Sequence, residues 1–436
     1  MDEKLRALGR REFLKAATAV AAAASLGLGR AGAAEEAAAA GGGRLVKFGI
    51  IGPGNQGRLD LSRALRVPNV RCTAVCDIYP PNLKAGLEVA GEGAQGFEDY
   101  RDLLAKGDVE AVMITTPLNM HAPIALAALQ AGKHIFVEKE MTKTIEEGKQ
   151  VIRAARQAGK VVQVGHQRRS SPTYQHALDL VEQGVLGKIT NVRALWHRNG
   201  SWRRAVPEGE NYDVTKWGYP DLEHLVNWRL YKATSNGLMA ELGSHQLDVC
   251  DWFLKASPLA VTGFAGLDWF KDGREVWDNV QCIFEYPGGV RVVYTSIQTN
   301  AYDDYYEQFM GTEGTLILTH ETEGLLFREQ SAEELAWQQF AHKAEVGGKT
   351  GIHLDARATV RKGKGEKGEG EAVGGAPGEE DAYYLEFVDW FKAIRTGTQP
   401  AANAEVGLRS SAACIVANEA MAKRRTIDFT DKHFSA

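Results

Sequence analysis

The 436-residue chain has little of several features that would assign it to a common class of protein. It contains five cysteines, an odd number without a Cys-x-x-Cys pair or a histidine-rich cluster, so neither a disulfide framework nor a zinc site is expected. The formal net charge is −5, which gives no electrostatic reason to expect nucleic acid as a partner. What remains is a globular chain without visible repeats, long enough for two or three domains.

The five cysteines occur in apolar patterns that are typical of a core. Cys72 and Cys76 lie four residues apart on an expected strand, so both should point to one face of a sheet. Cys250, Cys282 and Cys414 lie in apolar helical or strand patterns. Free, buried thiols are therefore expected at all five positions, and no metal ligands are assigned.

Residues 1–34 have the pattern of an export signal. The segment 10–15, Arg-Arg-Glu-Phe-Leu-Lys, resembles a twin-arginine signal, and the apolar run 16–28 after it is too short to span a bilayer comfortably. Ala31-Gly32-Ala33 offers a cleavage site, and residues 35–43 form a flexible linker. We expect a protein exported to the periplasm or beyond, with no stable membrane insertion afterwards. A disordered basic leader or an uncleaved anchor is the alternative.

The rest of the chain is organised around a glycine-rich turn. Residues 46–51 form a short apolar run that predicts a strand, and a helical pattern begins near Leu59. A G-x-G-x-x-G motif lies between them, with glycines that permit the turn, the approach of a diphosphate and close helix–strand packing. The diphosphate would lie at the helix N-terminus, against Gly52, Gly54, Asn55, Gln56 and Gly57.

Asp77 completes the dinucleotide fingerprint. It ends a second expected strand, 72–76, and lies twenty residues after Gly57. An acid there accepts hydrogen bonds from the adenosine ribose hydroxyls and repels a 2′-phosphate, which favours NAD over NADP. The alternative is a glycine turn followed by an ordinary aspartate at the end of a strand.

Residues 44–166 are expected to form a Rossmann domain with a doubly wound parallel sheet. Apolar runs alternate with amphipathic helical patterns through this region, an order typical of parallel α/β sheets. Ligands bind beyond the carboxyl ends of such strands. The residues that follow the strands should therefore contribute to the cofactor site: Thr116, Pro117, Asn119, His121, Glu138, Lys139 and Gln167.

Residues 167–436 are expected to form a second domain for substrate binding and oligomerisation. Alternating apolar runs joined by short turns between 260 and 319 predict a mainly antiparallel sheet. The segment 343–381 is rich in Gly, Lys and Glu, which indicates a mobile surface insertion. Helical patterns within 383–425 should pack back on the body of the protein.

Two groups of residues could carry chemistry. Lys139 follows a buried strand at the edge where a nicotinamide would lie, and it could stabilise charge on a substrate oxygen. Glu241 and His245 are spaced i, i+4 on an expected helix, with Asp248 one turn later, so the carboxylate of Glu241 could orient the imidazole as a base. The alternatives are a surface lysine and an incidental acid–histidine pair on an amphipathic helix.

These motifs together resemble the Gfo/Idh/MocA family, named for glucose–fructose oxidoreductase and inositol dehydrogenase. The resemblance covers about residues 45–330 and 383–425. Besides the glycine turn it rests on Thr116-Pro117-x-Asn119-x-His121, Glu138-Lys139, Gly187-Lys188-Ile189, Gly237 and Glu241-x-x-x-His245-x-x-Asp248. It implies a Rossmann domain, a C-terminal α/β domain whose open antiparallel sheet often mediates oligomers, and Lys139, Glu241 and His245 as active-site residues.

The chain departs from the family pattern at two positions. The family commonly has proline after the lysine, where this chain has Glu140, and a shorter aspartate where this chain has Glu241. Either change could mark a subfamily with different chemistry.

A further set of residues could recognise substrate. The segment 196–231 is dense in aromatic side chains, which could stack on sugar faces or fill an interface between domains or subunits. The set assigned to substrate, in addition to Lys139, Glu241 and His245, is Arg168, Trp202, Trp228 and Arg229.

The function expected is an exported NAD(H)-dependent carbohydrate oxidoreductase, a homo-oligomer that transfers hydride between a sugar or polyol carbinol and a tightly bound nicotinamide. Free NAD is scarce outside the cytoplasm, so a redox-neutral cycle is attractive. One alternative is an NAD-dependent glycoside hydrolase that cleaves through a keto-sugar by oxidation, elimination, hydration and reduction. Another, from a different class, is a non-catalytic NAD-bound sensor.

Overall fold

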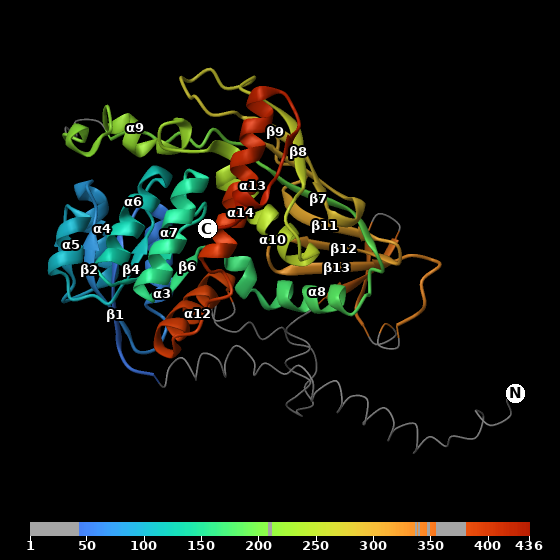
Figure 1. Cartoon of the computed structure of the whole chain (residues 1–436), viewed down its shortest axis with the longest axis horizontal. Helices are drawn as coiled ribbons and strands as arrows, with labels where there is room; N and C mark the ends of the chain where they lie inside the picture. The colour runs from blue at the N-terminus through green and yellow to red at the C-terminus, as the bar shows by residue number, and fades with distance from the viewer. Residues whose placement is uncertain (1–42, 208–211, 336–337, 339–340, 347–348, 355–380) are drawn as a thin grey trace, which may run out of the picture.

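The computed structural model describes residues 43–207, 212–335, 338, 341–346, 349–354 and 381–436. Two sheet-based domains lie side by side, with helix α13 between them (Figure 1). The expected export signal, most of the linker and the part of the expected insertion over 355–380 lie outside the described residues. Among the described helices, none is long and apolar enough to cross a membrane.

The first domain is a six-stranded parallel sheet with strand order β3-β2-β1-β4-β5-β6. Helices cover both faces of the sheet, with α3, α4 and α12 on one and α5, α6 and α7 on the other. This confirms the predicted doubly wound Rossmann domain. The strands are β1 (Val46–Ile51), β2 (Val70–Cys76), β3 (Gln95–Phe97), β4 (Ala111–Ile114), β5 (His134–Val137) and β6 (Val162–Val164). The helices between them are α3 (Asn55–Ala64), α4 (Pro80–Ala90), α5 (Tyr100–Lys106), α6 (His121–Gln130) and α7 (Ile145–Ala158).

The second domain contains a ten-stranded sheet with order β14-β15-β13-β12-β11-β7-β10-β9-β8-β16. All neighbouring strands are antiparallel except β7 and β10, which confirms a mainly antiparallel sheet. The strands are β7 (Ile189–His197), β8 (Ala260–Gly266), β9 (Asn279–Tyr286), β10 (Val290–Ile297), β11 (Tyr305–Gly311), β12 (Gly314–Thr319), β13 (Glu323–Arg328), β14 (Lys343–Val346), β15 (Lys349–Leu354) and β16 (Ile427–Asp428). The helices that follow the Rossmann strands along the chain are α8 (Pro172–Glu182), α9 (Leu222–Val226), α10 (Ser244–Leu254), α12 (Ala382–Thr396), α13 (Ala404–Lys423) and α14 (Asp431–Phe434). Of these, α12 packs on the Rossmann sheet and α13 contacts both domains.

Part of the expected mobile insertion is regular structure. Residues 343–346 and 349–354 form strands that extend the sheet through pairing of β15 with β13. Ile352 and Leu354 are buried in the core of the domain, which explains why this segment pairs despite its polar composition. The expectation of a mobile segment was therefore wrong for this hairpin.

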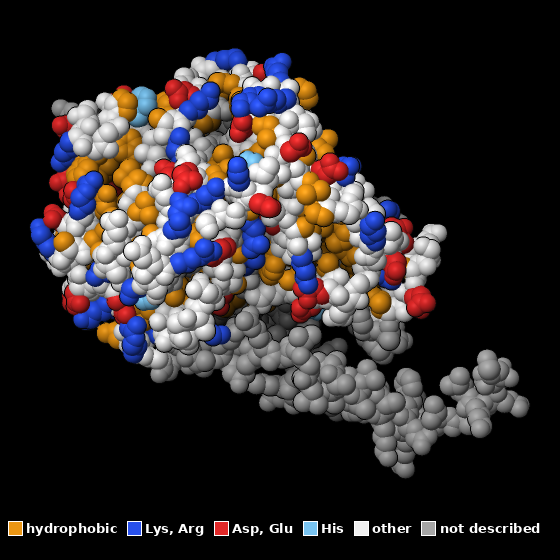
Figure 2. Space-filling view, viewed as in Figure 1, with side chains coloured by type: hydrophobic (Ala, Val, Ile, Leu, Met, Phe, Trp, Pro, Cys, Tyr) orange, Lys and Arg blue, Asp and Glu red, His pale blue; other side chains and the backbone are white. Residues whose placement is uncertain are grey.

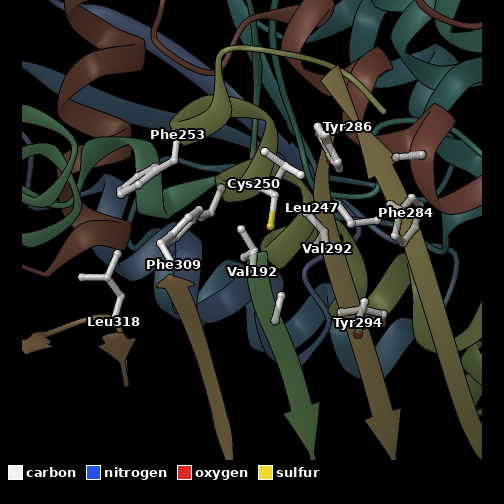
Figure 3. Packing of buried hydrophobic residues seen from close by; sticks show 14 of the residues in the cluster. Val192, Leu247, Cys250, Phe253, Phe284, Tyr286, Val292, Tyr294, Phe309 and Leu318 are labelled. Atoms are coloured by element: carbon white, nitrogen blue, oxygen red, sulfur yellow. The ribbon is translucent and has the colours of Figure 1, made fainter. Parts of the chain in front are cut away.

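The apolar core of the second domain lies between the sheet and helices α8, α10 and α13. Figure 3 shows Leu247, Cys250 and Phe253 of α10 against side chains of the sheet, where Phe253 and Phe309 stack with ring centroids 4.8 Å apart. The opposite face of the sheet is open and exposes Phe264, Ile283 and Val293. This packing explains the alternation of buried and exposed residues along β9 and β10.

The two C-terminal helices join the domains. Trp390 and Phe391 of α12 pack on Phe48 of the Rossmann sheet, and the Trp390 indole donates to the Ile135 carbonyl at 3.1 Å. Helix α13 contributes Leu408 to the Rossmann core and Cys414 to the core of the second domain. Helices α12 and α13 therefore fix how the two sheets face each other.

All five cysteines are free and buried. Cys72 and Cys76 nevertheless lie in cores on opposite faces of the Rossmann sheet, so the expectation that they share a face was wrong. The reason is a register shift in which Phe48 pairs with Cys72 but Gly49 pairs with Ala74. The extra residue in β2 reverses the alternation of side chains.

On the surface seen in Figure 2, acidic and basic side chains are interspersed.

Candidate active site and dinucleotide cleft

A cavity of about 600 Å³ lies at the carboxyl edge of the Rossmann sheet. Its walls are the β1–α3 turn, the residues after β2 and β4, and a segment of the second domain between Arg204 and Trp228. The sequence-predicted cofactor residues that line it are Gly52, Gly54, Asn55, Asp77, Thr116 and Pro117.

The glycine turn has the geometry that its motif requires. Gly52 has φ +89°, and a Cβ there would lie 2.8 Å from the Thr116 backbone nitrogen. A Cβ on Gly57 would lie 2.4 Å from the Thr115 hydroxyl, so this glycine permits close packing of helix and strand. Gly54 differs, because a Cβ there would have only the Gly52 carbonyl within 4 Å, at 3.9 Å. Its open side lies in the cavity, where a diphosphate could approach the backbone.

Two buried polar atoms of the cavity residues have no hydrogen-bond partner within the described chain, the Thr116 hydroxyl and the Trp217 indole nitrogen. Buried donors are normally satisfied, so unpartnered atoms in a cavity wall indicate that a polar ligand completes them. With the bare glycine backbone, these groups fit a dinucleotide.

Asp77 occupies the position expected for ribose recognition. Its carboxylate accepts a hydrogen bond from the Tyr79 backbone N–H at 2.8 Å, and burial raises the pKa of Asp77 to about 7. Arg58 of α3 contacts the neighbouring glycine turn, where it donates to the Pro53 carbonyl and to the Asn55 side chain. The residue can therefore accept hydrogen bonds from ribose hydroxyls at the adenosine end of the cavity.

Other sequence-predicted cofactor residues do not line the cavity and have partners in the protein. Gln56 donates to Asp60 of the same helix, and Gly57 packs on Thr115. Glu138 lies beside Asp60 and accepts from the Lys139 backbone N–H, while Gln167 donates to Glu321. Their contact with the cofactor stays a prediction, since position after a strand does not by itself fix the direction of a side chain.

His121 and Asn119 also lie outside the cavity wall. The His121 ring lies between two backbone carbonyls, with Nδ1 2.9 Å from Glu140 O and Nε2 2.9 Å from Thr116 O. It therefore braces the loops after β4 and β5. Asn119 interacts with Tyr219, which does line the cavity, so its effect on the cofactor site is indirect.

Lys139 and Glu241 meet across the two domains. The Lys139 ammonium donates to the Glu241 carbonyl at 3.1 Å and lies 3.9 Å from the Glu241 carboxylate. Arg229 binds the same carboxylate at 2.8 Å, and its guanidinium lies 4.3 Å from the centre of the Trp228 ring. Burial opposes ionisation of Glu241, but Arg229 and Lys139 outweigh it and lower the pKa of Glu241. Trp228 lines the cavity and so connects this cluster to the cofactor cleft.

His245 is close to this cluster but is not oriented by Glu241. The turn Met239–Gly243 is π-helical, and the Glu241 carboxylate points to Lys139 and Arg229. His245 Nδ1 has no partner in the described residues, and the ring lies 5.6 Å from Trp196 and 6.4 Å from His166. Burial, then the charges of Lys139 and Arg168, lower the pKa of His245 well below its usual value. The imidazole is therefore neutral, the form that accepts a proton.

Glu241 lies in the π-helical turn Met239–Gly243 and His245 in α10, so a regular α-helix does not run through both residues. The charge of Lys139 nevertheless acts on both side chains. The Asp248 carboxylate is bound by Arg169 through two nitrogens at 2.9 to 3.0 Å, in a buried ion pair within the second domain.

Arg168 and Trp202 have structural surroundings. The Arg168 side chain is 1% exposed, pairs with Glu307 and Glu321, and lies over the rings of Tyr174, Trp196 and Tyr305. Trp202 packs against the core of the second domain. Neither lines the cavity, so of the four added substrate residues only Trp228 does, with Arg229 behind it.

Sequence reasoning missed the cavity residues Tyr79, Trp217 and Tyr219 as cofactor contacts. The aromatic density of 196–231 was visible, but nothing in the pattern indicated that this segment crosses to the Rossmann domain. Figure 1 shows the part of this segment around α9 above the Rossmann helices and away from the sheet of its own domain.

Glu140, the residue in place of proline, is buried next to the cluster. Asn236 donates to its carboxylate at 2.8 Å, and its second oxygen has no partner in the described residues. Burial raises the pKa of Glu140 to about 8, so the side chain is a neutral acid at pH 7. The substitution therefore adds a buried hydrogen-bonding group beside Lys139 without adding a negative charge.

Glu140→Gln should reduce the pH dependence of stability. Between the unfolded pKa, 4.5, and the folded value of about 8, the native state binds more protons than the unfolded state, so Glu140 lowers wild-type stability as pH rises. The variant lacks this contribution. Its free energy of unfolding should fall less between pH 5 and pH 8, by on the order of 1–3 kcal/mol.

Chemical denaturation at both pH values measures this difference. Glu146→Gln on the exposed first turn of α7 is the matched control and should behave as the wild type. Parallel stability curves for Glu140→Gln and the wild type would contradict a neutral Glu140.

Comparison with known proteins agrees with this geometry. Residues 46–166 match the model of the oxidoreductase family with an NAD-binding Rossmann fold, and residues 174–317 match the GFO/IDH/MocA C-terminal domain. Together the two matches cover more than half of the chain.

Individual relatives are more distant. An inositol 2-dehydrogenase of Salmonella paratyphi B is 35% identical over 190 residues, which are 42% of this chain and 54% of the relative. A glycosyl hydrolase family 109 protein of Shewanella baltica is 29% identical, covering 36% of this chain and 39% of the relative. The chain thus spans about half the length, or less, of these curated relatives.

A solved structure of levoglucosan dehydrogenase with NADH and levoglucosan has the same fold. It superposes with a TM-score of 0.71 at 20% identity, covering 88% of this chain and 99% of that one. With both family domains present in order, and with the glycine turn in the geometry described above, the chain belongs to the GFO/IDH/MocA family of oxidoreductases, and residues 46–166 are its NAD-binding domain.

Proposed function

We propose that this protein is an exported enzyme that transfers hydride between a sugar or polyol carbinol and a tightly held NAD(H). The observation that carries the proposal is the approach of the Lys139 ammonium to the π-helical turn that leads into His245. In the proposal, Lys139 is the acid and the neutral His245 the base, and Trp228, which packs on Arg229, connects them to the cleft. The names of the relatives, inositol and levoglucosan dehydrogenases, support a carbohydrate substrate.

Each side chain has a separate role in this scheme. Bound NAD(H) supplies a hydride acceptor or donor. Lys139 donates a hydrogen bond to the reacting oxygen and stabilises the negative charge that develops on it. His245 accepts the hydroxyl proton, which its lowered pKa permits at neutral pH. Glu241, held by Arg229, fixes the position of the lysine and is a positioning residue.

A second candidate is glycoside cleavage by the same site. The similarity to a glycosyl hydrolase family 109 protein favours it. Oxidation of a glycoside to a ketone acidifies the adjacent C–H bond, elimination and addition of water cleave the glycosidic bond, and return of the hydride restores the alcohol. This cycle consumes no external oxidant. A protein that binds NAD but neither oxidises carbinols nor releases an aglycone would instead be a sensor.

Two further parts of the proposal concern location and assembly. The twin-arginine-like leader supports export, and replacement of both leader arginines by lysine should keep the protein in the cytoplasmic fraction.

The open sheet face supports a homo-oligomer, because Ile283 and Val293 lie opposite each other on β9 and β10 and are 46% and 39% exposed.

The oligomer has a direct test. Val293→Lys places a charge in the middle of this apolar face and should lower the mass measured by sedimentation equilibrium to that of one chain. Lys106→Glu, on the exposed surface of α5, is the control and should leave the mass unchanged. A wild-type protein that sediments as a monomer would contradict assembly altogether.

The enzymatic proposal is tested with Lys139→Ala and His245→Ala. Each should lower kcat by about 10²- to 10⁴-fold, because each removes a group that acts on the reacting oxygen or proton. Both should still copurify with nucleotide, since neither side chain lines the cavity. The assay follows reduction of the nucleotide by a panel of sugars and polyols and the release of aglycone from aryl glycosides.

Lys106→Ala and His176→Ala are matched controls that line no part of the cleft. Unchanged turnover in both Lys139→Ala and His245→Ala would overturn the site assignment. Aglycone release without net reduction would select the hydrolase over the oxidoreductase.

A further inference from the structure

The adenosine end of the cleft is covered by a segment that belongs to the second domain. We call residues 212–228 the strap. Its residues Lys216, Trp217, Tyr219, Leu225, Val226 and Trp228 form one wall of the cavity, and the opposite wall carries Asp77, Tyr79 and Asn82 after β2. A dinucleotide held by Asp77 would therefore lie between the two domains.

The strap is packed on the Rossmann domain through a small apolar core of its own. Val214, Tyr219 and Leu225 cluster with Tyr79, and all four side chains are at most 9% exposed. Tyr212 adds an edge-to-face contact with Tyr79, with ring centroids 5.4 Å apart. A buried cluster of this kind must be disrupted before the strap can move away from the cavity, so it opposes release of whatever lies beneath.

Polar contacts fix the same arrangement. The Lys216 ammonium binds Glu98 at 2.6 Å, from the strap to the loop after β3, although this pair is half exposed and adds little by itself. Trp217 is more informative, because its indole nitrogen is buried in the cavity wall and has no partner in the described residues. An indole N–H can only donate a hydrogen bond, so a ligand that pairs with it must present a hydrogen-bond acceptor.

We propose that the strap retains the dinucleotide between turnovers and that the Trp217 indole N–H donates a hydrogen bond to it. NAD is then a resident group, and the hydride taken from one carbinol is returned to a second carbonyl, or to the same sugar, before the nucleotide leaves. The proposal deepens the function proposed above and rests on it for the hydride steps. Retention by the strap does not depend on those hydride steps.

The test measures release of nucleotide from the full chain. Protein loaded with NADH is mixed with a large excess of NAD⁺, and loss of the fluorescence of bound NADH gives the release rate. Wild-type release should be slower than turnover. Trp217→Phe, which keeps the ring packing and removes the donor, should accelerate release about five- to tenfold, the effect of one hydrogen bond.

A second variant tests the packing of the strap. Leu225→Ala weakens the apolar cluster and should accelerate release by about tenfold or more. Trp269→Phe is the control, since that indole is 70% exposed and lines no part of the cavity, and its release rate should equal that of the wild type. Release from the wild type faster than turnover, or a Trp217→Phe rate equal to the wild type, would overturn the proposal.

The two proposals can fail separately. If strap variants release NADH faster but no sugar, polyol or glycoside reacts, retention stands and the proposed enzymatic function falls. If carbohydrates react with the bound nucleotide but strap variants release it at the wild-type rate, the function stands and the strap is only a contact between domains.

Discussion

The structure depends on a buried cluster of charge that joins the two domains at Glu241. Its carboxylate and carbonyl are the points at which Lys139, from the end of β5, and Arg229, from the second domain, converge. Taking these charges out of water is costly, and the cost is offset only while all partners are present. Removal of one partner would leave an uncompensated charge in a buried place. The relative position of the Rossmann edge and the π-helical turn is therefore tightly specified.

This constraint also determines the state of the nearby titratable groups. Three acids surround Lys139, but only Glu241 has a lowered pKa, because Arg229 faces it. Burial raises the pKa of Glu138 and of Glu140, which favours their protonated forms. Environments that separate the pKa values of neighbouring groups are typical of catalytic sites.

Much of the Rossmann domain could be predicted from the sequence, because its signals are local. Gly52 and Gly57 meet steric demands that a side chain would violate, Gly54 leaves the backbone bare toward the cavity, and Asp77 lies at a fixed distance along the chain from them. The antiparallel sheet was equally visible, since alternation along β9 and β10 follows from one buried face. In both cases a short stretch of sequence contains the whole physical reason for the local structure that it forms.

The errors share the opposite property, because each depends on contacts made far along the chain or on a local irregularity. Whether Arg168 meets substrate or Glu307 is decided by residues 139 positions away. A regular α-helix was expected through Glu241 and His245, but the turn that contains Glu241 is π-helical. Cys72 and Cys76 were placed on one face because a single extra residue in β2 has no sequence signature. Side-chain direction at a site therefore needs the tertiary structure even where the motif is clear.

The charge at the site suits hydride transfer to or from the carbon of an alcohol. Lys139 and Arg229 carry two positive charges and Glu241 one negative charge, while burial favours the protonated forms of Glu138 and Glu140, so this group has an excess positive charge next to the neutral His245. An alcohol that loses its proton and hydride passes through a state with negative charge on oxygen, which such an excess stabilises. Burial, together with the charges of Lys139 and Arg168, lowers the pKa of His245 and so keeps the imidazole ready to accept the proton. A proline at position 140 could not donate or accept a side-chain hydrogen bond there, whereas a neutral glutamic acid adds one polar group and leaves that charge balance intact.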